Sequence, residues 1–121
     1  MRLQHVTIPI PADGVARARA FYAGLLGLEE RDVLPDLDPE RFVWFRLEGD
    51  QELHLMLTDE APPEGQHFCL ELPAAGELEA LRLRLQAAGV ATRDGTRLAG
   101  RARFTCRDPF GNLIELARLD A

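Results

Sequence analysis

An internal repeat is the feature of this sequence that most constrains its fold. Three short segments of the first half recur 62 residues later and in the same order: Gln4-His5 as Gln66-His67, Leu26-Gly27-Leu28 as Ala88-Gly89-Val90, and Arg31-Asp32 as Arg93-Asp94. A constant shift of about half the chain is what an internal duplication leaves behind. We therefore expect two modules of one fold within the 121 residues.

Each half carries the same predicted order of elements: a strand, a helix and three further strands. The first half is expected to form strands at residues 3–10, 28–33, 42–48 and 52–58, with a helix that Asp13 caps and Gly27 ends. The second half is expected to form strands at residues 66–72, 90–94, 102–107 and 112–118, with a helix at 77–88. Residues 59–65 contain two prolines and read as a linker between module 1 (1–58) and module 2 (66–121) of a single domain (1–121). The predicted fold class is α+β, with two βαβββ modules in tandem that form a curved mixed sheet around a cleft and leave the helices outside.

Four potential metal ligands follow the repeat. The three histidines of the chain, His5, His54 and His67, each lie in a predicted strand, and Glu115 lies in the last strand. His5 and His54 are 49 residues apart, and His67 and Glu115 are 48 apart. Side chains alternate between the two faces of a strand, so all four are expected on the face opposite the helices. A buried carboxylate without a partner is costly, so Glu115 must point away from the core or contact a cation.

The composition excludes several classes of function. A net charge of -6 without any basic cluster argues against a nucleic-acid partner. The sequence has no apolar run of membrane-spanning length and no signal-peptide pattern, so we expect a cytoplasmic protein without a membrane partner. All 14 basic residues are arginine, which rules out Schiff-base and P-loop chemistry. Cys69 and Cys106 lack metal-type spacing and are expected to be buried, reduced thiols.

Three segments carry a resemblance to a known family: LQHVTIPI at residues 3–10, FYAGLLG at 21–27 and DPFGNLIEL at 108–116. With a histidine at the start of both modules, essentially the whole chain resembles the vicinal oxygen chelate superfamily. That superfamily includes glyoxalase I, fosfomycin resistance enzymes, extradiol ring-cleaving dioxygenases and bleomycin-resistance proteins. The resemblance implies that the first and last strands of each module supply metal ligands, here His5, His54, His67 and Glu115. Glyoxalase I enzymes usually carry glutamate where His54 stands, so this chain departs from a strict glyoxalase I.

The resemblance implies a small-molecule enzyme that depends on a divalent metal ion (Zn, Ni, Fe, Mn or Co) and chelates adjacent oxygens of its substrate. The two activities implied are a glyoxalase-like lyase or isomerase and a fosfomycin-resistance-like thiol transferase, with a thiol cosubstrate such as glutathione. Glu115 is a candidate general base as well as a ligand. The candidate substrate-binding residues lie on the faces of two predicted strands and are Trp44, Arg46, Arg103 and Thr105. The two arginines are included because a guanidinium binds carboxylate and phosphate groups well.

Two alternatives stay open. One is an Fe(II) ring-cleaving dioxygenase, in which two histidines and Glu115 would form a facial triad. Such enzymes usually have about twice this length. The other is a binding protein of the bleomycin-resistance type, which holds a drug without reacting.

Family members of this size commonly dimerise, so a homodimer is expected.

Overall fold

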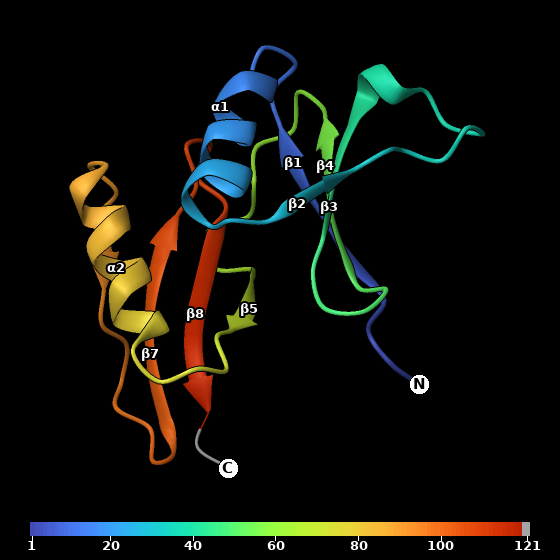
Figure 1. Ribbon diagram of the computed structural model, residues 1–121. Helices are drawn as coiled ribbons and strands as arrows, with labels where there is room; N and C mark the ends of the chain where they lie inside the picture. The colour runs from blue at the N-terminus through green and yellow to red at the C-terminus, as the bar shows by residue number, and fades with distance from the viewer. Residues whose placement is uncertain (120–121) are drawn as a thin grey trace. The chain divides into compact units, whose positions relative to one another are not determined.

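The computed structural model describes residues 1–119, which divide into two compact units. The first unit comprises Met1–Pro63, and the second begins at Glu64. The boundary falls within residues 59–65, the segment expected to link two modules. Each unit contains one strand, a helical segment and three further strands in that order, and the first unit adds a short 3-10 helix before its third strand (Figure 1). The prediction of two βαβββ modules and an α+β fold class is therefore confirmed.

The first unit is a four-stranded mixed sheet with the order β1-β4-β3-β2. Its strands are β1 (His5–Ile10), β2 (Glu29–Arg31), β3 (Phe42–Arg46) and β4 (Glu52–Leu57). β1 and β4 are parallel, whereas the β2–β3 and β3–β4 pairs are antiparallel. Helix α1 (Val15–Arg19) continues into the π-helical segment η1 (Ala20–Leu25), and the 3-10 helix η2 (Pro39–Arg41) precedes β3.

The two faces of the first sheet differ in character. Phe45, Leu53 and Leu55 are fully buried, and the Tyr22 ring of η1 lies with its centroid 5.7 Å from that of Phe45. This face therefore forms the core beneath η1. Trp44 and His54 alternate with these residues and lie on the opposite face, as strand geometry requires.

The second unit repeats the arrangement with the strand order β5-β8-β7-β6. Its elements are β5 (His67–Glu71), α2 (Glu77–Ala87), β6 (Thr92–Arg93), β7 (Arg101–Arg107) and β8 (Leu113–Leu119). The α2 helix buries Leu78, Leu81 and Leu85 at helical spacing. Its Arg82 guanidinium lies 5.2 Å from the centre of the Phe104 ring, so α2 covers the face of the sheet that carries Phe104.

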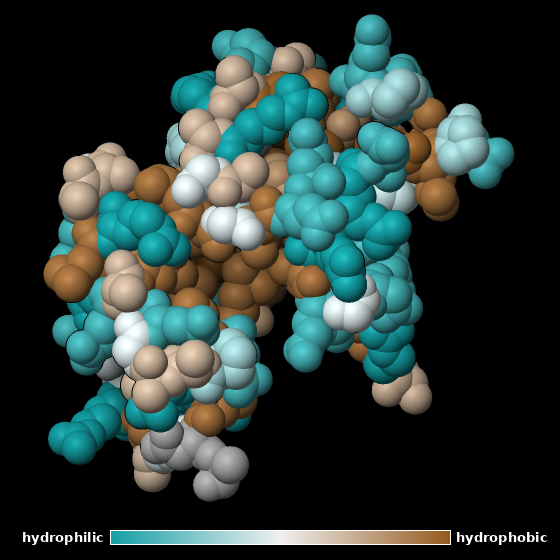
Figure 2. Space-filling model, in the orientation of Figure 1, coloured by the Kyte–Doolittle hydropathy of each residue, from teal (hydrophilic) through white to brown (hydrophobic). Residues whose placement is uncertain are grey.

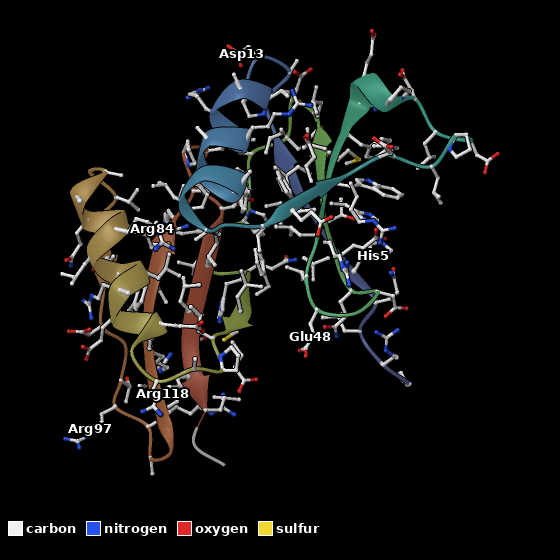
Figure 3. The ribbon with its side chains drawn as sticks, viewed as in Figure 1. His5, Asp13, Glu48, Arg84, Arg97 and Arg118 are labelled. Atoms are coloured by element: carbon white, nitrogen blue, oxygen red, sulfur yellow. The ribbon has the colours of Figure 1, made fainter. Side chains whose placement is uncertain are left out.

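Two local predictions in the first unit were wrong. Asp13 does not cap α1: the N-cap residue is Gly14, and no side chain bonds to the helix start. A turn closed by the bond from Gly14 N to Pro11 O places Asp13 one residue too early (Figure 3). The strand expected at 28–33 is reduced to the three exposed residues of β2.

A helix long and apolar enough to cross a membrane is absent from residues 1–119, and Figure 2 shows a largely hydrophilic surface over the first unit.

Candidate metal centre

His67 and Glu115 form a close pair in the second unit. His67 begins β5, and Glu115 lies in the neighbouring parallel strand β8, in register with Cys69. His67 Nε2 lies 3.3 Å from Glu115 Oε2, and the Glu115 side chain is only 10% exposed. Two ligands bound at about 2.0–2.1 Å to one tetrahedral metal ion stand about 3.3–3.4 Å apart. The separation therefore suits two ligands of a single ion.

The hydrogen bond of His67 to Gly65 determines which ring nitrogen carries the proton and which has the lone pair that faces Glu115. Nδ1 lies 3.1 Å from the carbonyl oxygen of Gly65, which can only accept, so Nδ1 carries the proton in the neutral ring. Nε2 then directs its lone pair at a carboxylate oxygen, which also has lone pairs. Two such groups at 3.3 Å repel unless a proton or a metal ion lies between them. The pair therefore suits either a shared proton or a bound cation.

His5 and His54 are the corresponding pair of the first unit. Gln4 Nε2 donates to the Asp50 carbonyl at 2.7 Å, so its Oε1 accepts from His5 Nδ1, also at 2.7 Å, and leaves His5 Nε2 free. His54 Nε2 lies 3.3 Å from Glu52 Oε1, which leaves Nδ1 as its free nitrogen. Each imidazole thus has one nitrogen anchored by an acceptor and one lone pair available, as metal-binding histidines usually do.

The His54 ring is enclosed on both faces. The Trp44 ring stacks on it at 3.8 Å with an interplanar angle of 2°, and the His5 ring at 4.2 Å with an angle of 20°. Burial lowers the pKa of His54, and this outweighs the opposite effect of the Glu52 carboxylate. A ring nitrogen directs its lone pair in the ring plane, so two stacked, nearly parallel rings do not aim at one point. His5 or His54 must turn before both can bind one ion.

The two pairs occupy equivalent places in their sheets. The Cα partner of His54 is Thr7, two residues after His5, and the partner of Glu115 is Cys69, two residues after His67. The structure brings His5 together with His54, and His67 together with Glu115. Within residues 1–119, it contains no group of three His, Cys, Asp or Glu side chains that could hold a metal ion.

The four candidate substrate-binding residues have different surroundings. Arg46 is exposed, bonds to the Gly49 carbonyl at 3.1 Å and borders an open groove of about 420 Å³. Trp44 is buried, and its Nε1 has no hydrogen-bond partner in the part of the chain that is described. Thr105 pairs with Glu115 across β7 and β8, whereas the Arg103 guanidinium bonds to Glu115 itself.

Sequence reasoning missed Gln4 and Glu52, which anchor His5 and His54. The signal for Glu52 was available, because a residue two positions before His54 in a strand must share its face. The expectation of a buried Cys69 was wrong, since the residue is exposed. Partial burial of its thiol and the nearby Glu115 carboxylate raise the pKa of Cys69. Cys106 is buried as expected, and burial raises its pKa to about 11.

Comparison with known proteins identifies the family. Among solved structures, a protein from Bacillus anthracis assigned to the glyoxalase family is 27% identical, with a TM-score of 0.87 over 99% of this chain and 96% of that one. Lactoylglutathione lyase from Agrobacterium tumefaciens is 23% identical, with a TM-score of 0.69 over 97% of this chain and 92% of its own. TnmS3, an antibiotic binding protein from Streptomyces sp. CB03234, is 24% identical, with a TM-score of 0.76 over 99% and 97%.

The last two likenesses show the fold alone. A search of curated proteins gave no match. The family model of the Glyoxalase/Bleomycin resistance protein/Dioxygenase superfamily matches residues 2–116, nearly the whole chain. The chain therefore belongs to the Glyoxalase/Bleomycin resistance protein/Dioxygenase superfamily.

Proposed function

We propose that this protein is a metal-dependent enzyme that binds a divalent cation through His5, His54, His67 and Glu115 and chelates adjacent oxygens of a small substrate. The reaction class is that of a glyoxalase-like lyase or isomerase, or of a thiol transferase with a cosubstrate such as glutathione. Membership of the superfamily supports a small-molecule ligand, and the four donors are of the type that Zn, Ni, Fe, Mn and Co accept.

One observation carries the proposal. His67 Nε2 and Glu115 Oε2 face each other at 3.3 Å, while the other nitrogen of His67 is committed to the Gly65 carbonyl. The arrangement is repulsive for a neutral imidazole and becomes favourable when a cation lies between the two atoms. Because the Gly65 carbonyl holds His67 and the Arg103 guanidinium holds Glu115, an ion bound there would meet two ligands already placed at this distance.

The chain's own residues would divide the remaining work. His5 and His54 would be the other two ligands, with Gln4 and Glu52 holding their opposite nitrogens. Trp44 and Thr105 lie on the same sheet faces as these ligands and are the candidates to contact the substrate. A bound divalent cation would supply Lewis-acid stabilisation of negative charge on the substrate oxygens.

Metal titration tests the proposal, and the protein carries a built-in reporter. Trp44 is the only tryptophan and stacks directly on His54, so an ion that turns the stacked rings should change its fluorescence. Metal-free protein would be titrated with Zn²⁺, Ni²⁺, Co²⁺, Mn²⁺ and Fe²⁺, and bound metal counted by elemental analysis after dialysis. We expect stoichiometric retention of at least one of these ions, with a fluorescence change that saturates at the same ratio.

Variants separate specific ligation from binding at the acidic surface. His67→Ala and Glu115→Gln should weaken binding by about 10–100-fold or more, as loss of a ligand or of its support does. Glu71→Gln is the matched control, because Glu71 is an exposed carboxylate on β5, two positions beyond Cys69. Wild-type protein that retains no ion, or variants that bind as tightly as wild type, would refute the proposal.

A non-catalytic small-molecule binding protein is the second candidate. It is favoured by the His5–His54 stack, which does not direct two lone pairs at one point, and a structural neighbour, TnmS3, is an antibiotic binding protein. Calorimetry with a panel of antibiotics in the presence of chelator distinguishes the two. Tight binding of a drug by metal-free protein, with no metal retained, would establish this function in place of the enzyme.

The homodimer and the cytoplasmic location remain predictions; sedimentation of the metal-free and metal-loaded protein would test the first.

A further inference from the structure

The Glu115 carboxylate is held from two sides by different groups. Its Oε1 lies 3.3 Å from Arg103 Nη1, and its Oε2 lies 3.3 Å from His67 Nε2. Arg103 reaches it diagonally from β7, where its own register partner is Ala117. Each carboxylate oxygen therefore has its own partner, and the one not taken by Arg103 faces His67.

The Arg103 guanidinium is itself held in place. Nη2 donates to the Thr96 carbonyl at 2.8 Å, and the side chain is only 18% exposed. A Cβ at Gly95 would lie 2.7 Å from Nη2 and 2.9 Å from Cζ, so the guanidinium packs directly against the Gly95 backbone. Only glycine leaves room for the group at this distance. The loop at Gly95 and Thr96 and the carboxylate of Glu115 together determine where the guanidinium lies.

Two features indicate that this contact serves Glu115 and not Arg103. Arg103 Nε is buried without a hydrogen-bond partner in the described part of the chain, so the side chain leaves one donor unsatisfied to reach the carboxylate. Other arginines of the same strand face are exposed, and Arg107 is directed to the carbonyls of Gly111 and Glu64. Among the arginines of β7, Arg103 is the one whose guanidinium bonds to a candidate ligand.

We propose that Arg103 is a positioning residue for Glu115. By occupying Oε1 it presents only Oε2 on the side of His67, so that Glu115 acts as a monodentate ligand. The contact also keeps the carboxylate from swinging away, which disfavours the alternative role of Glu115 as a detachable general base. The metal part of this inference rests on the proposed function, whereas the orientation of Glu115 toward His67 does not.

Four variants test the inference. Arg103→Met removes the guanidinium and retains a long side chain. Gly95→Ala displaces the guanidinium but keeps its charge. Arg101→Met is the matched control, because Arg101 lies on the same strand and the same face, two positions earlier. Arg103→Lys is added because it retains the charge without the two-pronged geometry.

The first measurement is Co²⁺ binding, followed by visible absorption. Arg103→Met and Gly95→Ala should weaken Co²⁺ binding by about 10–100-fold, the usual effect of losing a group that orients a ligand. The absorption of bound Co²⁺ should also weaken, because a carboxylate with two free oxygens raises the coordination number. Arg101→Met should match wild type, and Arg103→Lys should fall between. Wild-type affinity and spectrum in Arg103→Met would overturn the proposal.

A second measurement uses metal-free protein, so that the inference and the proposed function can fail separately. The ¹⁵N chemical shifts of the His67 ring report its contact with Glu115. They should change in Arg103→Met and Gly95→Ala and stay unchanged in Arg101→Met. If wild type binds no metal but these shifts change, the proposed function fails and the positioning role stands. If the shifts do not change, the positioning role is refuted even when wild type binds metal.

Discussion

Replacing Asp108 tests whether the turn before β8 is held by one carboxylate. Asp108 is buried, and its Oδ1 accepts from the backbone nitrogens of Phe110 and Asn112, both at 2.9 Å. Its Oδ2 accepts from Asn112 Nδ2 at 2.8 Å. Asp108→Ala removes the two carboxylate oxygens that accept these three hydrogen bonds. A buried donor left without its partner costs about 1–3 kcal/mol, and both donors of the buried Asn112 are affected, so we expect the free energy of unfolding to fall by about 3 kcal/mol.

Urea unfolding of metal-free protein measures this loss, which corresponds to a fall in melting temperature of about 10 °C for a chain of this size. Asp108→Asn is the control, because its amide oxygen can still accept from the two backbone nitrogens. Only the bond to Asn112 Nδ2 is lost, since the new amide nitrogen is a donor at that position. The free energy of unfolding of Asp108→Asn should fall by about half as much as that of Asp108→Ala. A loss below about 1 kcal/mol for Asp108→Ala, or equal losses for both variants, would refute the reasoning that these bonds hold the turn.

Three further outcomes are expected. Burial raises the pKa of the Cys106 thiol to about 11 in the folded protein from an ordinary value of 9.0, so the free energy of unfolding should fall by about 2–3 kcal/mol from pH 9 to pH 11. Cys106→Ala should flatten that part of the pH profile, and an unchanged slope would contradict it. In native protein at pH 8, iodoacetamide should label Cys69 alone, and faster in Glu115→Gln because the carboxylate that helps raise the pKa of Cys69 is gone. Leu85→Ala should destabilise α2 by about 2–5 kcal/mol in thermal unfolding, whereas the exposed Leu83→Ala should change stability by less than about 0.5 kcal/mol.

The repeat and the strand alternation were enough to predict the two βαβββ modules and the sheet face on which each candidate ligand lies. A period of two determines which side chains share a face, and for this reason His54 and Trp44 could be placed opposite Phe45. The Asp-Pro and Gly-Asn residues of the turn likewise predicted its position. These signals are local and depend only on the covalent geometry of the chain.

Two of the predictions that failed, those for Cys69 and for residues 28–33, depend on where a strand lies in its sheet. Cys69 lies between Phe68 and Leu70 and reads as a core residue, yet β5 is an edge strand and the thiol is exposed. β2 is also an edge strand, and it is shorter than its apolar neighbours suggested. The strand order is set by contacts between distant segments, which a single sequence does not display. The stacking of His5 on His54 is of the same kind, because it depends on rotamers that packing selects.

The two units differ in the side chains that surround His54 in β4 and Glu115 in β8. His54 and Glu115 hold equivalent register positions, and the residue two before the cross-strand partner is Phe42 in the first unit and Arg103 in the second. An imidazole can be buried between aromatic rings at little cost, and His54 is packed against Trp44 in this way. A carboxylate at the same depth needs a positive partner, and Arg103 supplies it. The two units thus keep equivalent places for His54 and Glu115, while the residue beside each place suits the charge of that side chain.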